Sequence, residues 1–205
     1  MSVQMKRLSW MIITIGFMTV SFNSRVEAQE MLTPIFNGED LSGWVVPQDN
    51  IWYKAQDGML KIKSGPDQTG SILWTEKSYS NFILECEFKM GEGTVDSGVF
   101  IRADHEQIQI GISGSLKRDM TASPYIAGKG YPVEAAGVKE LLDEDGWNDM
   151  TIVAKGAHYS VWLNGAFVMT YKSDTAVERG PVGIQLHSNR DMDIDFRNIH
   201  IASLR

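Results

Sequence analysis

The chain has 205 residues, a net charge of −7 at neutral pH and a single cysteine, Cys86. An acidic chain cannot release phosphate counterions over a broad surface, which argues against nucleic acid as a partner. One cysteine cannot form an internal disulfide, and the length suits one domain that rests on its own hydrophobic core.

The first predicted element is an export signal. Lys6 and Arg7 precede an apolar run over residues 8–22, and a short polar stretch then leads to a small-residue site that ends at Ala28. The run of about 15 residues is shorter than the roughly 20 that a membrane-spanning helix needs. We therefore expect a signal peptide over residues 1–28, a periplasmic or secreted domain over residues 29–205, and no membrane span. A retained N-terminal anchor is the alternative.

After this segment, short runs rich in β-branched and aromatic residues alternate with turn residues. Asp57-Gly58 and Asn164-Gly165 each separate two such runs, which is typical of a tight hairpin turn. Helix is expected only as a possible short turn over residues 138–142. The predicted strands cover residues 51–54, 59–63, 71–75, 82–89, 98–103, 107–111, 150–154, 159–163, 167–171, 183–187 and 194–201. This pattern predicts an all-β sandwich or jelly roll.

Four of these strands combine one apolar face with an unusual polar face, because successive side chains in a strand point to opposite sides. Solvated sheet faces favour Lys, Thr, Glu and Ser, whereas amides, carboxylates and guanidinium groups match sugar hydroxyls as paired donors and acceptors. The pattern therefore predicts a sugar-facing groove, with a merely polar outer surface as the alternative. The polar faces carry Glu85, Glu87, Arg102, Gln107, Gln109, Gln185 and His187.

Six segments, in order along the chain, together resemble one known family. They occupy residues 36–44, 96–102, 146–150, 161–165, 180–187 and 196–199 and read FNGEDLSGW, DSGVFIR, GWNDM, VWLNG, GPVGIQLH and FRNI. This series is similar to the bacterial 3-keto-disaccharide hydrolase domain over residues 33–204. The resemblance implies a concanavalin-like jelly-roll β-sandwich of two antiparallel sheets, and a substrate that is a glycoside already oxidised to a ketone at C3.

The chemistry that this resemblance implies is an elimination. A ketone at C3 acidifies the hydrogen on C2, so a base can remove it, the C1 substituent can leave, and water can add back. Such a site needs a general base, a cation or donors for the enolate oxygen, and an acid or metal for the leaving group. No cofactor and no metal site is indicated by residue spacing, although a divalent metal in the groove stays open.

Three residues are the predicted catalytic group. His187 is the choice for proton transfer, because histidine changes charge near neutral pH. Arg102 is the choice for stabilising the oxyanion, because its guanidinium offers a planar fork of donors. Glu87 would act as a second base or orient one of the other two. The alternatives are a hydrogen-bonded structural histidine and an ion pair between Arg102 and Glu87.

The remaining predicted residues would contact the substrate. The alternative for Asp96 is a structural role as a turn residue. Gln107 stands where many relatives carry a glutamate. The substitution indicates either different substrates or a site that binds without catalysis, and the adjacent Glu106 is expected on the opposite face of its strand. The full set of expected substrate contacts is Gln107, Gln109, Gln185, Tyr125, Lys117 and Asp96.

The long segment over residues 112–146 is predicted to form a lid or wall, because long excursions from a compact sandwich are uncommon. Tyr125 and Tyr131 could stack on a sugar ring there, with Lys117 or Arg118 on its hydroxyls, and ordinary loop packing is the alternative. Two rival functions also stay open. One is a lectin-like binding module, since the fold does not fix function. The other is a classical glycosidase that uses Glu85 and Glu87 as its carboxylate pair.

Overall fold

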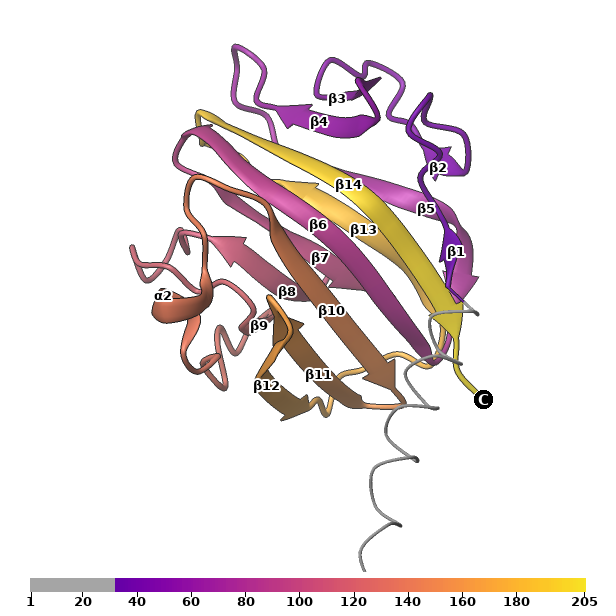
Figure 1. The fold of residues 1–205 in the computed structure, drawn as a ribbon, viewed down its shortest axis with the longest axis vertical. Helices are drawn as coiled ribbons and strands as arrows, with labels where there is room; N and C mark the ends of the chain where they lie inside the picture. Colours follow the sequence, from indigo (N-terminus) through magenta and orange to yellow (C-terminus); the bar gives the residue numbers. More distant parts are fainter. Residues whose placement is uncertain (1–31) are drawn as a thin grey trace, which may run out of the picture. The chain divides into compact units, whose positions relative to one another are not determined.

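The computed structural model describes residues 32–205, so the predicted export signal lies outside the described residues. The described part of the chain is almost entirely β-structure and folds into two antiparallel sheets that lie face to face (Figure 1). The one helix among residues 32–205 is the single turn α2 (Val138–Leu141). The predicted all-β sandwich is therefore confirmed. No helix within residues 32–205 is long and apolar enough to cross a membrane.

Sheet A has the strand order β12-β11-β10-β6-β14-β4-β3, and β1 pairs with β14 beside this path. Its strands are β1 (Thr33–Pro34), β3 (Tyr53–Gln56), β4 (Met59–Lys63), β6 (Phe82–Gly93), β10 (Asn148–Lys155), β11 (His158–Leu163), β12 (Ala166–Lys172) and β14 (Met192–Ser203). Both predicted hairpins belong to this sheet, β3 with β4 and β11 with β12. Asp57, Gly58, Asn164 and Gly165 all have positive φ, as such two-residue turns require.

Sheet B has the strand order β2-β5-β13-β7-β8-β9. Its strands are β2 (Trp44–Val45), β5 (Ser71–Tyr79), β7 (Asp96–Ile101), β8 (Glu106–Gly111), β9 (Pro124–Ile126) and β13 (Gly180–Leu186). The short strands β1, β2 and β9 were not expected from the sequence, because two or three residues carry no measurable alternation.

The core lies between the two sheets and is built by alternation. Phe82, Leu84, Cys86 and Phe88 point inward from β6, while Ile108 and Ile110 point inward from β8. Each fully buried Phe, Leu or Ile side chain contributes about 1.5–3 kcal/mol of hydrophobic free energy. Burial raises the pKa of the Cys86 thiol far above its ordinary value, which fits the predicted role of a small buried hydrophobe.

Arg102 does not face a groove, and the expectation that it would is wrong. Strand β7 ends at Ile101, and Arg102 adopts a positive φ of 64° that turns its side chain inward. Its guanidinium donates hydrogen bonds to the carbonyl oxygens of Ser80 at 3.1 Å and Gly156 at 2.6 Å. It also donates to the hydroxyl of Tyr159 at 3.3 Å. The residue therefore ties loops of the two sheets together instead of stabilising an oxyanion.

The same buried network includes Glu106, which faces the core as expected. Its carboxylate accepts hydrogen bonds from the hydroxyls of Tyr159, Ser173 and Thr175. Burial, and then the adjacent Glu106 carboxylate, raise the pKa of Tyr159 well above its ordinary value, so this phenol stays protonated. A carboxylate held in this way is satisfied internally and is not offered to a ligand.

Glu87 lies on the outer face of sheet A, opposite to the core, and does not meet Arg102. Its carboxylate accepts hydrogen bonds from Arg197 Nε at 2.7 Å and Asn198 Nδ2 at 2.6 Å. The Arg197 guanidinium in turn lies 4.0 Å from the centre of the Trp147 ring. Partial burial disfavours the Glu87 carboxylate, but the hydrogen bonds from Asn198 and Arg197 outweigh it and lower the pKa of Glu87.

Replacing Arg102 by Met should lower the free energy of unfolding by about 3 kcal/mol, because several buried carbonyl oxygens lose their donor and no polar group replaces it. Urea denaturation followed by circular dichroism measures this change. Arg118→Met is the matched control, since Arg118 pairs with Glu134 on the exposed surface and should affect stability far less. A stable Arg102→Met protein that has lost only activity would contradict the structural role.

Glu87→Gln should reduce stability at neutral pH by at most about 1 kcal/mol, because the ion pair is partly solvated. Since folding lowers the pKa of Glu87, the contribution is present above its ordinary value of 4.5 and is lost as the pH falls through the lowered folded value. Wild type and variant should therefore converge in acid, as measured by urea titrations at several pH values. A difference that does not depend on pH would contradict the ionic origin.

Candidate functional site

The outer face of sheet B, which points away from the core, carries three rows of side chains that run across the strands. The first row contains Trp74, Gly183, Phe100, Gln107 and Tyr125, each paired with the next in the strand register. Directly opposed residues of antiparallel strands share one face, so these side chains lie side by side. The inward-facing neighbours Leu73, Val99, Ile101, Ile108 and Ile184 belong to the core.

The second and third rows are more polar. The second row contains Ile72, Gln185, Gly98 and Gln109, where Ile72 pairs with Gln185 and Gly98 pairs with Gln109. Gln185 lies beside Gly98 because the preceding pair is Ile184 with Val99. The third row brings His187, just beyond the end of β13, next to Asp96 at the start of β7. Three strands thus present amide, imidazole and carboxylate groups to the same surface.

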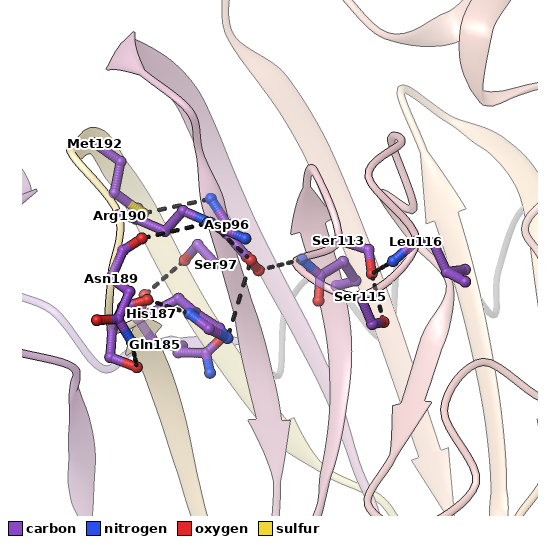
Figure 2. A network of polar contacts seen from close by, with 12 residues as sticks. Asp96, Ser97, Ser113, Ser115, Leu116, Gln185, His187, Asn189, Arg190 and Met192 are labelled. Atoms are coloured by element: carbon purple, nitrogen blue, oxygen red, sulfur yellow. Dashed lines mark hydrogen bonds and ion pairs between the residues drawn. The ribbon is translucent and has the colours of Figure 1, made fainter.

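Asp96 is the centre of the polar network, although its side chain is only 2% exposed. Gln109 Nε2 donates a hydrogen bond to Asp96 Oδ1 at 2.9 Å, and Arg190 Nε donates to Oδ2 at 3.3 Å. Figure 2 shows Arg190 and His187 approaching Asp96 from the segment that follows β13. Asp96 is thus a strand residue with charged and polar partners, and the alternative of a simple turn residue does not describe it.

His187 is oriented by its own backbone neighbourhood. Its Nδ1 lies 2.7 Å from the carbonyl oxygen of Ser188, a contact that is a hydrogen bond only when Nδ1 carries the proton. In the neutral ring this leaves Nε2 as the unprotonated nitrogen. Nε2 lies 3.9 Å from Asp96 Oδ2, and the side chain is 37% exposed. A nitrogen that can accept a proton therefore lies beside a carboxylate and within reach of solvent.

Two glutamine oxygens in these rows have no hydrogen-bond partner. They are Oε1 of Gln107 and Oε1 of Gln185, both buried. Gln107 donates from Nε2 to Gln109 Oε1 at 3.3 Å, and Tyr131 donates from its hydroxyl to the same oxygen at 3.0 Å. Buried acceptors without a donor are uncommon in proteins. These two oxygens therefore lack the donor that a buried acceptor normally has.

The predicted wall is formed by the segment that follows β8. Tyr131 reaches back from it to Gln109, and its ring meets that of Tyr125 edge to face at a centroid distance of 5.3 Å. Gly114 passes over Arg190, where an added Cβ would come within 2.7 Å of the guanidinium. Lys117 lies three residues beyond with an exposed side chain, so it stays a predicted contact from the rim.

The structure therefore brings together most of the expected residues but not all of them. His187, Asp96, Gln107, Gln109, Gln185 and Tyr125 share the outer face of sheet B. Glu87 faces outward from sheet A, so the core separates it from His187. Arg102 is enclosed between loops of the two sheets. The expected catalytic group of three residues does not form, and only His187 remains at this surface.

Sequence reasoning missed Arg190 and the role of Trp74. Arg190 lies in the loop between β13 and β14, where alternation gives no direction for a side chain. Trp74 could have been found, because it alternates with the buried Leu73 and Thr75 and so had to face away from the core. No group of three or more His, Cys, Asp or Glu side chains within residues 32–205 is arranged to hold a metal ion.

Solved structures with the same fold include proteins connected with carbohydrates. One is a "putative glycosyl hydrolase" of Parabacteroides distasonis, with a TM-score of 0.67 and 19% identity over 88% of this chain and 97% of its own. Another with that description from the same organism has a TM-score of 0.64 and 25% identity over 84% and 99%. The carbohydrate-binding module CBM66 of Bacillus subtilis has a TM-score of 0.53 and 15% identity over 78% and 96%.

A comparison with curated proteins gives no significant match. The model of one protein family, in contrast, matches residues 32–202, which is nearly the whole described chain. This match confirms the resemblance carried by the six sequence segments. The chain belongs to the family of the 3-keto-alpha-glucoside-1,2-lyase-like domain.

Proposed function

We propose that this protein is an exported enzyme that cleaves 3-keto-glycosides by proton abstraction at C2, elimination of the C1 substituent and addition of water. The observation that carries the proposal is the placement of His187. Its Nδ1 is held by the Ser188 carbonyl oxygen, while its Nε2 lies beside Asp96 at a surface lined by amide groups. Membership of the family supplies the substrate class.

In this proposal His187 is the general base. Nε2 takes the proton from C2 of the oxidised ring, and the electron pair of that C–H bond forms the enolate with the C3 carbonyl. In this state Nε2 lies 3.9 Å from the Asp96 carboxylate. When the C3 carbonyl re-forms, the C1 substituent leaves with its bonding electrons and takes the proton that His187 received, directly or through water. Water then adds across C1 and C2, so the net reaction is hydrolysis.

Arg190 takes the role for which the sequence suggested Arg102. Arg190 Nε lies 3.3 Å from Asp96 Oδ2, which fixes the guanidinium, and the Arg190 side chain is 20% exposed. A positive group held in place before reaction stabilises an enolate oxygen at little cost in reorganisation. The unpaired oxygens of Gln107 and Gln185 would accept hydrogen bonds from substrate hydroxyls. Asp96 thus positions both the base and the cation.

A second candidate function is lectin-like binding without turnover. It is favoured by Gln107, because many relatives carry a glutamate at this position. The site would then keep its hydroxyl-binding amides and lack an acid or base that the reaction needs. A protein that binds a 3-keto-glucoside without converting it, and that gains turnover on Gln107→Glu substitution, would establish this alternative.

The direct test compares a 3-keto-glucoside with its unoxidised parent. We expect release of the C1 substituent from the ketone alone, because only the ketone acidifies C2. Release from the unoxidised parent would instead indicate a classical glycosidase. Binding of both compounds without release would indicate the lectin.

His187→Gln should lower turnover of the 3-keto-glucoside by about 100- to 10,000-fold, the usual effect of a missing acid–base group. Glutamine keeps a donor for the Ser188 carbonyl oxygen but cannot accept and return a proton, so binding of the ketone should persist. His200→Gln is the matched control, because His200 Nδ1 makes a similar 2.8 Å contact with the Asn198 carbonyl oxygen from β14 of sheet A. Near-normal turnover of the His187→Gln protein would remove this residue from the mechanism.

A further inference from the structure

Gln109 uses its whole hydrogen-bonding capacity within the protein, although the sequence suggested a contact with substrate. The residue is only 1% exposed. Its Nε2 donates to Asp96 Oδ1 at 2.9 Å and to the carbonyl oxygen of Ile110 at 3.5 Å. Its Oε1 accepts from the Tyr131 hydroxyl at 3.0 Å and from Gln107 Nε2 at 3.3 Å. A glutamine amide offers two donors and two acceptor sites, so no group of Gln109 is left for a ligand.

Asp96 sets the direction of these hydrogen bonds. A carboxylate only accepts, so the Gln109 amide must turn its nitrogen toward Asp96 and its oxygen the other way. The atom of Gln107 that faces this oxygen must then be a donor, which is Nε2. The other atom, Gln107 Oε1, is left buried without a donor, over Gly98. We call Asp96, Gln109 and Gln107 the hydrogen-bond series.

A carboxylate at position 107 would conflict with the carboxylate of Asp96. It would have no donor for Gln109 Oε1 and would lie against that oxygen in a buried row. If the Gln109 amide turned around, it would donate to position 107 but would set its oxygen against Asp96 Oδ1. One amide cannot turn its NH2 group toward both ends. The two ends of the series therefore compete for a single donor group.

The surroundings of the series are charged at one end only. The titratable and charged side chains on the elements packed against it are Asp96 on β7, Tyr125 on β9, Tyr131 in the wall, and His187 and Arg190 after β13. Arg190 and His187 lie beside Asp96, whereas Tyr125 is the register partner of Gln107. Burial raises the pKa of Tyr131, so its hydroxyl keeps the proton that it donates to Gln109.

We propose that Gln109 is a positioning residue that permits one ionised carboxylate in the series, and that Gln107 assigns this charge to Asp96. The inference deepens the proposed function and rests on it for the catalytic consequence. Asp96 holds Arg190 and lies beside His187, so its charge is in place for the reaction. A carboxylate at position 107 would be separated from both groups by Gln109.

Gln107→Glu tests the competition by its pH dependence. In acid the introduced carboxyl is protonated, and its O–H group donates to Gln109 Oε1 as the amide does. Folding should raise the pKa of this carboxyl, because only the neutral form fits. The variant should therefore match the wild type near pH 4 and lose stability as the pH rises above about 4.3, the ordinary glutamate pKa. Urea denaturation should show a midpoint that falls increasingly below that of the wild type up to about pH 8.

Gln56→Glu is the matched control for the added charge. Gln56 Nε2 also donates to an oxygen, Asp57 Oδ2 at 3.1 Å, but this pair lies on the exposed surface of sheet A. Water replaces the lost donor there, so the difference from the wild type should stay small at every pH. A Gln107→Glu protein whose loss of stability does not depend on pH, or is as small as that of the control, would overturn the inference.

A double-mutant cycle tests the shared donor. Asparagine at position 96 supplies its own donor, so the Gln109 amide is free to turn around. Asp96→Asn should therefore lower the urea midpoint at about pH 8 less in the Gln107→Glu protein than in the wild type, and additive losses would overturn the competition. Repeating the cycle in a Gln109→Met protein keeps the charges and removes the amide. Coupling that persists there undiminished would reflect direct repulsion and would remove Gln109 from this role.

Turnover of the 3-keto-glucoside measures the catalytic consequence. The ratio of kcat in the Gln107→Glu protein to kcat in the wild type should fall by at least about 10-fold between about pH 5 and pH 8, as the protonated carboxyl is lost. A variant more active than the wild type at pH 8 would overturn the inference. If the wild type does not convert the ketone but the pH-dependent loss of stability and the coupling are found, the proposed reaction fails and the role of Gln109 stands.

Discussion

The candidate site depends on one buried charge, the carboxylate of Asp96. A carboxylate that is 2% exposed has lost most of its hydration, which is costly unless charged or polar partners replace the water. Gln109 supplies a donor from β8 and Arg190 supplies one from the loop after β13. Because one group binds partners from both neighbours of β7, it fixes these segments relative to one another. The same contacts set the surroundings of His187, whose Nε2 lies 3.9 Å from this carboxylate.

The two ends of β7 show how a short strand serves both surfaces of a sheet. At its beginning, Asp96 faces outward and holds the polar network on the outer face of sheet B. Just beyond its end, the positive φ of Arg102 turns a long cationic side chain inward, where it binds backbone carbonyl oxygens and the Tyr159 hydroxyl. Glu106 completes this second network from the start of β8. The Arg102 network joins loops of the two sheets, with Nε of Arg102 unpaired, while the Asp96 network lies beside glutamine acceptors without donors.

The outer face of sheet B is divided by chemistry along its strands. His187, Asp96 and Arg190 concentrate charge at one end, the partly exposed Trp74 packs against the buried Phe100 at the other, and glutamines lie between them. A reaction that passes through an enolate needs fixed charge only near the carbonyl, and recognition of a neutral ring needs flat apolar area with hydrogen-bonding edges. Glycine at positions 98 and 183 makes room for this arrangement, because a Cβ at either would collide with Gln107 or Trp74.

The sequence by itself determined the all-β architecture, both hairpins, the inward faces of the main strands and the family. These features follow from alternation, turn residues and local motifs, which act over a few neighbouring positions. It also placed Gln107, Gln109, Gln185 and His187 on polar faces, because parity within a strand is a local property. It could not decide which polar faces meet. Alternation places Glu87 and His187 each on the polar face of its own strand. The strand of Glu87 belongs to sheet A and that of His187 to sheet B, so the core separates the two residues. Only the tertiary structure revealed the role of Arg190, because its loop follows no periodic pattern. Only the structure revealed the inward turn of Arg102, because a single positive φ interrupts the alternation of side chains along a strand.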